Sequence, residues 1–240
     1  MMKRILVAAS TIGLLVTFAT GAGAATPTSL SGLTGAQVDA LAIAQMRAVG
    51  SYTLVVTSTV AGLHATSVTS STLYSGIRHD DINGQLGEKV FVNGVVYVRF
   101  TAPVEKIYFG KVIASLANKW ISFTPGQPFY SLFSTTMSES TLAPLLTLRG
   151  TLNVSPPLTY DHRHVVAITP AASAATSPSG IAETLYVSNS APFLPVALVI
   201  DSHSSAPSKT LETVTFKNWG VHVTVRAPRH FTASSKFKLP

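Results

Sequence analysis

The sequence has 240 residues, of which 46% are hydrophobic and 11% charged, with a formal net charge of +7 at pH 7 and no cysteine. This hydrophobic fraction is ample for the core of one domain or two small ones. The lack of cysteine excludes disulfides, thiolate nucleophiles, thiolate metal ligands and a lipid-modified cysteine. The positive charges are too dispersed for a nucleic-acid interface. Low charge combined with abundant Thr, Ser, Val and Ala is typical of an exported β-protein.

The first 25 residues have the three parts of a secretory signal peptide. A positively charged MMKR start precedes an apolar run over Ile5–Thr20, and the small residues GAGAA follow. This run is shorter than the roughly 20 residues that span a bilayer. We expect cleavage after Ala24 or Ala25, rather than retention as an anchor. Residues 26–240 would then form a single domain, secreted or associated with the cell wall.

A helix is predicted between Thr34 and Gly50. Thr34 is a favourable N-cap residue and Gly50 a typical C-terminal stop, and the apolar residues between them recur at helical spacing. We expect one broad face to be buried, carrying Val38, Leu41, Ala42, Met46 and Val49.

From Ser51 onward the apolar period changes to two, which predicts an antiparallel meander. The clearest signal lies within Glu88–Phe100, where two β-rich runs are joined by Asn93 and Gly94. An Asn-Gly pair tolerates the positive φ angles of a type I′ hairpin turn. The DING segment at Asp81–Gly84 predicts a second turn of the same chemistry.

The middle of the chain is predicted to be helical. A helix is expected to begin near Pro103 and to continue irregularly past Gly110, followed by a short strand at Trp120–Phe123. Short helical turns are expected between Thr124 and Leu146. The two-residue period then returns in six segments, which we interpret as strands: LTLRGTLNV, HRHVVAI, AETLYVSN, PVALVIDS, LETVTFKN and VHVTVRAP.

Several predicted strands carry apolar residues on both faces. In one of them, Val96, Val98 and Phe100 alternate with Val95 and Tyr97. A sheet with one face in water would show a cleaner alternation of apolar and polar residues. We therefore expect an α+β fold in which the few helices cover the second face of the sheet.

Four phrases occur in an order and spacing that resemble the actinobacterial LppX/LprG-like exported lipoproteins, which are similar to the lipoprotein carrier LolA. They are EKVFVNGVVYVR, ANKWISF, ETLYVSNSAPFLPVALVID and VTFKNWGVHVTVRAP, and the resemblance runs from about Ala36 to Pro228. It implies a strongly curved antiparallel sheet, a half-barrel, whose concave face is covered by helices. It also implies an apolar cavity between sheet and helices that holds acyl chains.

The resemblance implies a non-enzymatic carrier of a long-chain lipid or lipidated glycolipid within the cell envelope. The chain departs from the family in lacking the anchoring cysteine, which favours a freely secreted or wall-associated carrier. We expect a monomer with no cofactor, no metal and no nucleic-acid partner, and an envelope lipid transporter is a further candidate partner. The residues expected to line the cavity are Leu54, Val56, Val96, Val98, Phe100, Tyr108, Phe109, Phe129, Phe133, Leu185, Val187, Leu198 and Ile200.

The segment LTYDHRHVVAI concentrates polar chemistry and leaves other functions to consider. In a continuous strand, His162 and His164 would share one face and Asp161 and Arg163 the other, so the four could not converge. We interpret them as a solvated strand surface. Two alternative functions remain: a secreted hydrolase using Asp161, His162 or His203 near a serine, and a structural or adhesive cell-wall β-protein. No standard hydrolase motif is present.

Overall fold

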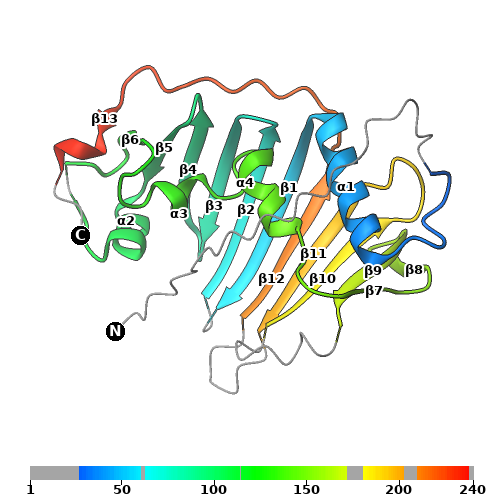
Figure 1. Ribbon diagram of the computed structural model, residues 1–240. Helices are drawn as coiled ribbons and strands as arrows, with labels where there is room; N and C mark the ends of the chain where they lie inside the picture. Colours follow the sequence, from blue (N-terminus) through cyan, green and yellow to red (C-terminus); the bar gives the residue numbers. More distant parts are fainter. Residues whose placement is uncertain (1–26, 61–62, 114, 172–180, 203–209, 238–240) are drawn as a thin grey trace.

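The computed structural model describes residues 27–60, 63–113, 115–171, 181–202 and 210–237, and contains one open sheet with helices against one face (Figure 1). The thirteen strands are antiparallel neighbours except for the parallel pair β13–β6, and the order is β13-β6-β5-β4-β3-β2-β1-β12-β11-β10-β9-β7, with β8 beside β9. The predicted fold class, an α+β half-barrel with helices on one face, is confirmed.

The helices and strands follow one another as in the prediction of meander, helical insert and second meander. The helices are α1 Gly35–Val49, α2 Ala102–Phe109, α3 Tyr130–Ser134, α4 Glu139–Leu146 and the 3-10 turn η1 Ser234–Lys236. The strands are β1 Ser51–Val60, β2 Leu63–Thr72, β3 Gly76–Ile82, β4 Gln85–Val92, β5 Val95–Phe100, β6 Ile121–Phe123, β7 Leu152–Val154, β8 Leu158–Tyr160, β9 Arg163–Pro170, β10 Ile181–Ser188, β11 Pro195–Ser202, β12 Thr210–Lys217 and β13 Thr232–Ala233.

Helix α1 has the predicted ends. The hydroxyl of Thr34 accepts a hydrogen bond from the Gln37 N–H, and the Gln37 side chain accepts one from the Thr34 N–H, so the two form a capping box. Gly50 ends the helix with a φ of 79°. By contrast, α2 stops at Phe109 because Gly110 is left-handed, with a φ of 70°. The expected continuation of α2 past Gly110 is therefore wrong.

Both predicted hairpin turns are present. Asn93 and Gly94 have φ angles of 53° and 73°, and Val92 pairs with Val95, which makes a two-residue turn. Asn83 and Gly84 repeat the arrangement between β3 and β4, with φ angles of 51° and 79°. Positive φ at both turn positions is the signature of a type I′ turn.

Replacing Gly94 by valine is expected to destabilise the fold by about 1 kcal/mol or more, because a β-branched residue is strained at positive φ. A Cβ at this position would meet no atom within 4 Å apart from its chain neighbours, so the expected loss comes mainly from backbone strain. Denaturant unfolding measures it. The control is Gly94→Asn, which tolerates positive φ and should cost less; equal losses for the two variants would contradict this explanation.

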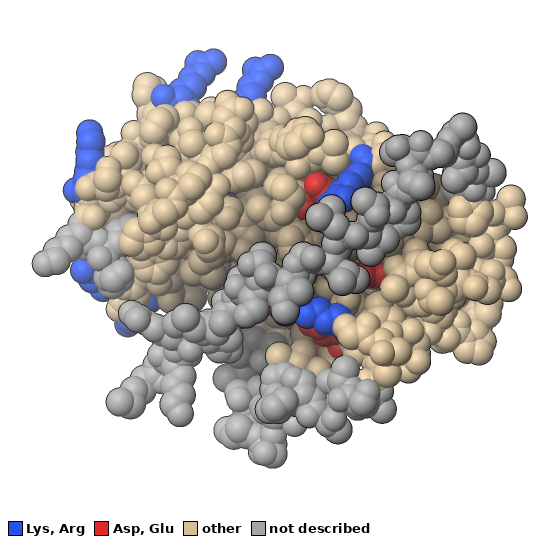
Figure 2. All heavy atoms as spheres, in the orientation of Figure 1, with Lys and Arg blue, Asp and Glu red and all other residues tan. Residues whose placement is uncertain are grey.

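Two separate hydrophobic clusters lie on the helix-bearing face of the sheet, which we call the covered face. The first, the α1 cluster, joins α1 and α4 to β1 and β9–β12, and includes Met46, Leu54 and Leu198. The second, the α2 cluster, joins α2 and α3 to β4–β6, and includes Val98 and Phe133. In Figure 2, the few acidic side chains visible on this side of the molecule lie near its middle with basic side chains beside them, and further Lys and Arg side chains lie at the left and upper rim.

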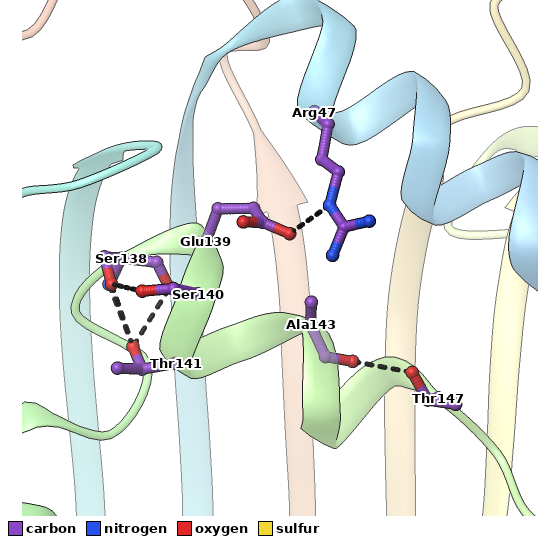
Figure 3. Close-up of polar contacts among 7 residues, drawn as sticks. All are labelled: Arg47, Ser138, Glu139, Ser140, Thr141, Ala143 and Thr147. Atoms are coloured by element: carbon purple, nitrogen blue, oxygen red, sulfur yellow. Dashed lines mark hydrogen bonds and ion pairs between the residues drawn. The ribbon is translucent and has the colours of Figure 1, made fainter. Parts of the chain in front are cut away.

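An ion pair fixes α4 against α1 (Figure 3). Glu139, which is buried at the start of α4, accepts a hydrogen bond from Arg47 Nε at 2.6 Å. The start of α4 is also stabilised by a local hydrogen bond, because the N–H of Ser138, its N-cap residue, donates to Thr141 Oγ1 at 3.1 Å. The two helices over the α1 cluster are thus connected to each other as well as to the sheet.

The segment Val221–Pro228 is not a strand, so this part of the prediction is wrong. It runs in an extended form along one end of the sheet, from the end of β12 towards β13 (Figure 1). Ser51 Oγ donates to the Val221 carbonyl at 2.8 Å, and beyond the segment Phe231 packs against Tyr97 with ring centroids 5.0 Å apart. The physical reason is topological: β12 lies between β1 and β11, so no free strand edge is next to it.

The predicted signal peptide lies outside the described residues. Within the described ranges, no helix is long and apolar enough to cross a membrane.

Candidate functional site

A polar centre separates the two hydrophobic clusters on the covered face. Directly paired residues of neighbouring strands share a face of the sheet. The pairs Leu54–Thr69, Thr69–Arg78, Arg78–Lys89 and Lys89–Val98 therefore form one row across five strands. The row begins in the α1 cluster, passes over three polar residues and ends in the α2 cluster. The polar centre consists of Ser67, Thr69, Ser71, Arg78, Asp80 and Lys89.

Asp80 bridges the two cations of the polar centre. Its Oδ1 lies 2.6 Å from Arg78 Nε, and its Oδ2 lies 2.8 Å from Lys89 Nζ. The side chains of Asp80 and Lys89 are each 3% exposed, whereas that of Arg78 is 20% exposed. Arg78 Nη1 also donates to Thr136 Oγ1 at 2.9 Å, in the segment between α3 and α4. Of the three charged groups, Arg78 is the one that solvent reaches.

Aromatic rings of the α2 cluster surround Lys89. Its Nζ lies 5.0 Å from the ring centroid of Tyr108, 5.5 Å from that of Phe133 and 5.9 Å from that of Phe100. It also donates to the Tyr108 hydroxyl at 3.3 Å. Electron-rich ring faces attract a cation, so these contacts compensate in part for lost hydration.

The pKa values within the polar centre follow from burial and mutual charge. Burial, reinforced by the charge of Arg78, lowers the pKa of Lys89 to about 8, although Asp80 opposes the shift. Burial raises the pKa of Asp80, but the charges and hydrogen bonds of Lys89 and Arg78 outweigh this effect and leave the pKa below its usual value. At neutral pH the centre therefore holds two positive charges and one negative charge.

The residues predicted to line a cavity all lie in or against the two clusters of the covered face. One group belongs to the α1 cluster: Leu54, Val56, Leu185, Val187, Leu198 and, partly buried, Ile200. The other belongs to the α2 cluster: Val96, Val98, Phe100, Phe109, Phe133 and, partly buried, Tyr108 and Phe129. The structure thus brings them together as two sets, with the polar centre between. That they line a ligand cavity stays a prediction.

Pockets among the described residues include the following two. The first, of about 340 Å³, opens beside the start of α1 and is lined by Ser29–Leu33, Val154, Ser155, Pro157, Val166 and Asn189. Leu30 and Val166 are members of the α1 cluster, so this pocket reaches its edge. The second, of about 310 Å³, lies between Asn118–Trp120 and His230–Thr232, near β6 and β13.

The polar residues of LTYDHRHVVAI do not form a continuous strand surface, which corrects the prediction. Asp161 and His162 have φ angles of 47° and 60° and form a two-residue turn, because Tyr160 pairs with Arg163. All four residues from Asp161 to His164 are exposed, as expected. Among the described residues, no three His, Asp or Glu side chains are grouped as metal ligands. His203 lies outside the described residues.

The polar centre was missed in the sequence, although a signal for it is present. A two-residue turn at Asn83–Gly84 places Arg78 opposite Lys89. Arg78 and Asp80 are two residues apart and therefore share a face of β3. The apolar period alone does not reveal this position, because charged residues in an alternating strand are ordinarily expected on the solvent side.

No protein-family model matches the sequence. A search of the curated proteins likewise finds no match.

Solved structures with a similar arrangement include three of low sequence identity. LprF from Mycobacterium bovis is 14% identical, with a TM-score of 0.49 over 81% of this chain and 96% of that chain. A LolA superfamily protein from Nitrosomonas europaea is 6% identical, with a TM-score of 0.31 over 80% and 95%. A DUF1329 family protein from Desulfovibrio piger is 8% identical, with a TM-score of 0.29 over 80% and 96%.

Proposed function

We propose that the protein is a non-enzymatic lipid carrier that holds acyl chains between the covered face and its helices. The observation that carries this proposal is the covered face itself, on which helices lie over two separate apolar clusters of one open sheet. The pocket beside α1 supports an entry at the edge of the α1 cluster, and its volume is at the lower end of the range of ligand pockets.

The energetics of such a carrier require little besides apolar walls. Burying one methylene group contributes about 0.8 kcal/mol. A long acyl chain therefore gains more from apolar contact than from any one hydrogen bond. Entry of a chain between α1, α4 and the sheet would separate these helices from the sheet, and the ion pair of Arg47 and Glu139 favours their moving together.

Lipid extraction tests the proposal. Protein purified without detergent is extracted with organic solvent, and the extract is examined by mass spectrometry. A long-chain lipid in stoichiometric amount is expected. If the folded protein neither releases a lipid nor accepts one from vesicles, the carrier function is rejected and a structural role is favoured.

Trp substitutions test where the acyl chains lie. Leu198 and Val98 are 1% and 0% exposed, in the α1 and α2 clusters respectively. Leu198→Trp and Val98→Trp are expected to fill space and reduce lipid occupancy at least several-fold, whereas His162→Ala and His164→Ala should leave it unchanged. Because overpacking costs roughly 1 to 3 kcal/mol, unfolding is measured in parallel. Folded Trp variants that load as wild type would contradict the assignment.

The remaining properties of the carrier are part of the same proposal. The predicted signal peptide and the missing anchoring cysteine support a secreted or wall-associated monomer. Its ligand would be a long-chain lipid or lipidated glycolipid, and an envelope lipid transporter would supply or receive it.

A further inference from the structure

The polar centre carries one positive charge more than its own carboxylate neutralises. Arg78 and Lys89 share Asp80, and all three lie on the covered face between apolar clusters. Buried charge is retained at a high cost unless it is paired. Glu212, on the same face of β12, also interacts electrostatically with Arg78; burial raises the pKa of Glu212, and the charge of Arg78 opposes this shift. Glu139 is occupied by Arg47.

Donors of the polar centre remain unused. Arg78 donates through Nε and Nη1, and no described residue accepts from its Nη2. Lys89 has three N–H groups, of which one is directed to Asp80 and one to Tyr108. Thr69 is 0% exposed, and its Oγ1 has no hydrogen-bond partner among the described residues. Buried hydroxyl groups almost always have a partner, so the one at Thr69 indicates a missing acceptor or donor.

The three residues are neighbours on the covered face. Thr69 pairs directly with Arg78, and Arg78 pairs directly with Lys89, on β2, β3 and β4; the guanidinium and ammonium groups both contact Asp80. A guanidinium group with two free N–H directions is suited to a phosphate or carboxylate oxygen pair. Leu54 and Val98 continue the row on either side, so an anion here would have apolar surface on both sides.

We propose that Thr69, Arg78 and Lys89 bind the anionic head group, a phosphate or carboxylate, of the lipid that the protein carries. The site rests on the proposed carrier function and narrows its substrate class to anionic lipids. The acyl chains would extend over the clusters beside the polar centre, and Arg78, the most exposed of its charged groups, would meet the head group first.

Lipids with matched chains test this site. Folded protein is loaded from vesicles containing phosphatidic acid or diacylglycerol with identical acyl chains, and bound lipid is quantified by mass spectrometry. Wild type is expected to favour phosphatidic acid at least tenfold. Equal loading of both lipids would overturn the head-group site while leaving the carrier function intact, and loading of neither would reject the carrier function itself.

Substitutions in the polar centre test whether its residues cause the preference for phosphatidic acid. Thr69→Val preserves size and strand preference and is expected to reduce the preference for phosphatidic acid at least threefold; Arg78→Gln should abolish it, and Arg78→Lys should restore part of it. The matched control is Arg99→Gln, in the neighbouring β5, since Arg99 is exposed and pairs with Glu88. If folded Thr69→Val and Arg78→Gln both keep the wild-type preference, the proposal is wrong.

Two further experiments test whether the anion belongs to a lipid or is free in solution, and whether Lys89 takes part in binding it. Inorganic phosphate at millimolar concentration is expected to leave lipid loading unchanged, and efficient competition would mean a free-anion site instead. The preference should also decline as pH rises through about 8, because Lys89 then loses its proton beside Arg78, Asp80 and Tyr108. A preference constant from pH 7 to 9.5 would remove Lys89 from the site.

Discussion

Replacing Asp80 by asparagine is expected to lower the free energy of unfolding by about 3 to 5 kcal/mol, the usual cost of removing one partner of a buried ion pair. The substitution would leave Arg78 and Lys89 facing each other without the carboxylate that now lies within 2.8 Å of both. Chemical denaturation at pH 7 measures the loss.

The control is Glu88→Gln, one strand away. Glu88 pairs with Arg99 at the surface, where an ion pair contributes about 1 kcal/mol or less. Replacing Asp80 and Lys89 together, by asparagine and methionine, should recover part of the loss, since the rings of Phe100, Tyr108 and Phe133 can pack against an apolar chain. A loss for Asp80→Asn no larger than that for Glu88→Gln would show that water screens the two cations.

Replacing Gly76 by alanine is expected to cost about 3 kcal/mol, at the upper end for overpacking. A Cβ at Gly76 would lie 2.1 Å from the Met137 carbonyl oxygen and 2.9 Å from Ser71 Oγ. The segment between α3 and α4 rests on the sheet at this point, where Ser71 Oγ also donates to the Met137 carbonyl. The added methyl group would therefore push this segment away from the sheet.

Gly87→Ala is the matched control, on the same face of the next strand. Its Cβ would lie 3.0 Å from a ring carbon of Phe100, and a side chain can yield more easily than a backbone carbonyl. A loss of about 1 kcal/mol is expected there. Thermal unfolding compares the two, and equal melting temperatures for both variants would show that the α3–α4 segment adjusts freely.

Local chemistry explains which parts of the fold could be predicted from the sequence. The caps of α1 at Thr34 and Gly50 and the turns at Asn83–Gly84 and Asn93–Gly94 depend on residues within a few positions of one another. The two-faced apolar pattern of β5 likewise predicted that helices cover a second face, and the covered face bears this out.

The features that were missed depend on partners distant in the chain. Val221–Pro228 alternates as a strand does, but pairing requires a free edge, and both edges of β12 are occupied. Asp161 and His162 were placed in a strand, although Asp and His are among the non-glycine residues enriched at positive φ. Predicting the polar centre would require the pairing register of three strands, which the pattern of a single strand does not give.

The pairing of β1 with β12 joins two halves of the sheet, β1 to β6 and β7 to β12, that are synthesised at different times. Thr53 pairs with Lys217, whereas the hairpins from β1 to β5 join residues close in the chain. A chain made from its N-terminus can complete those hairpins early, and contacts between distant residues form slowly. Until β12 arrives, β1 is an unpaired edge able to recruit a strand from another molecule. The extent of aggregation during refolding should therefore depend on how quickly β12 pairs with β1.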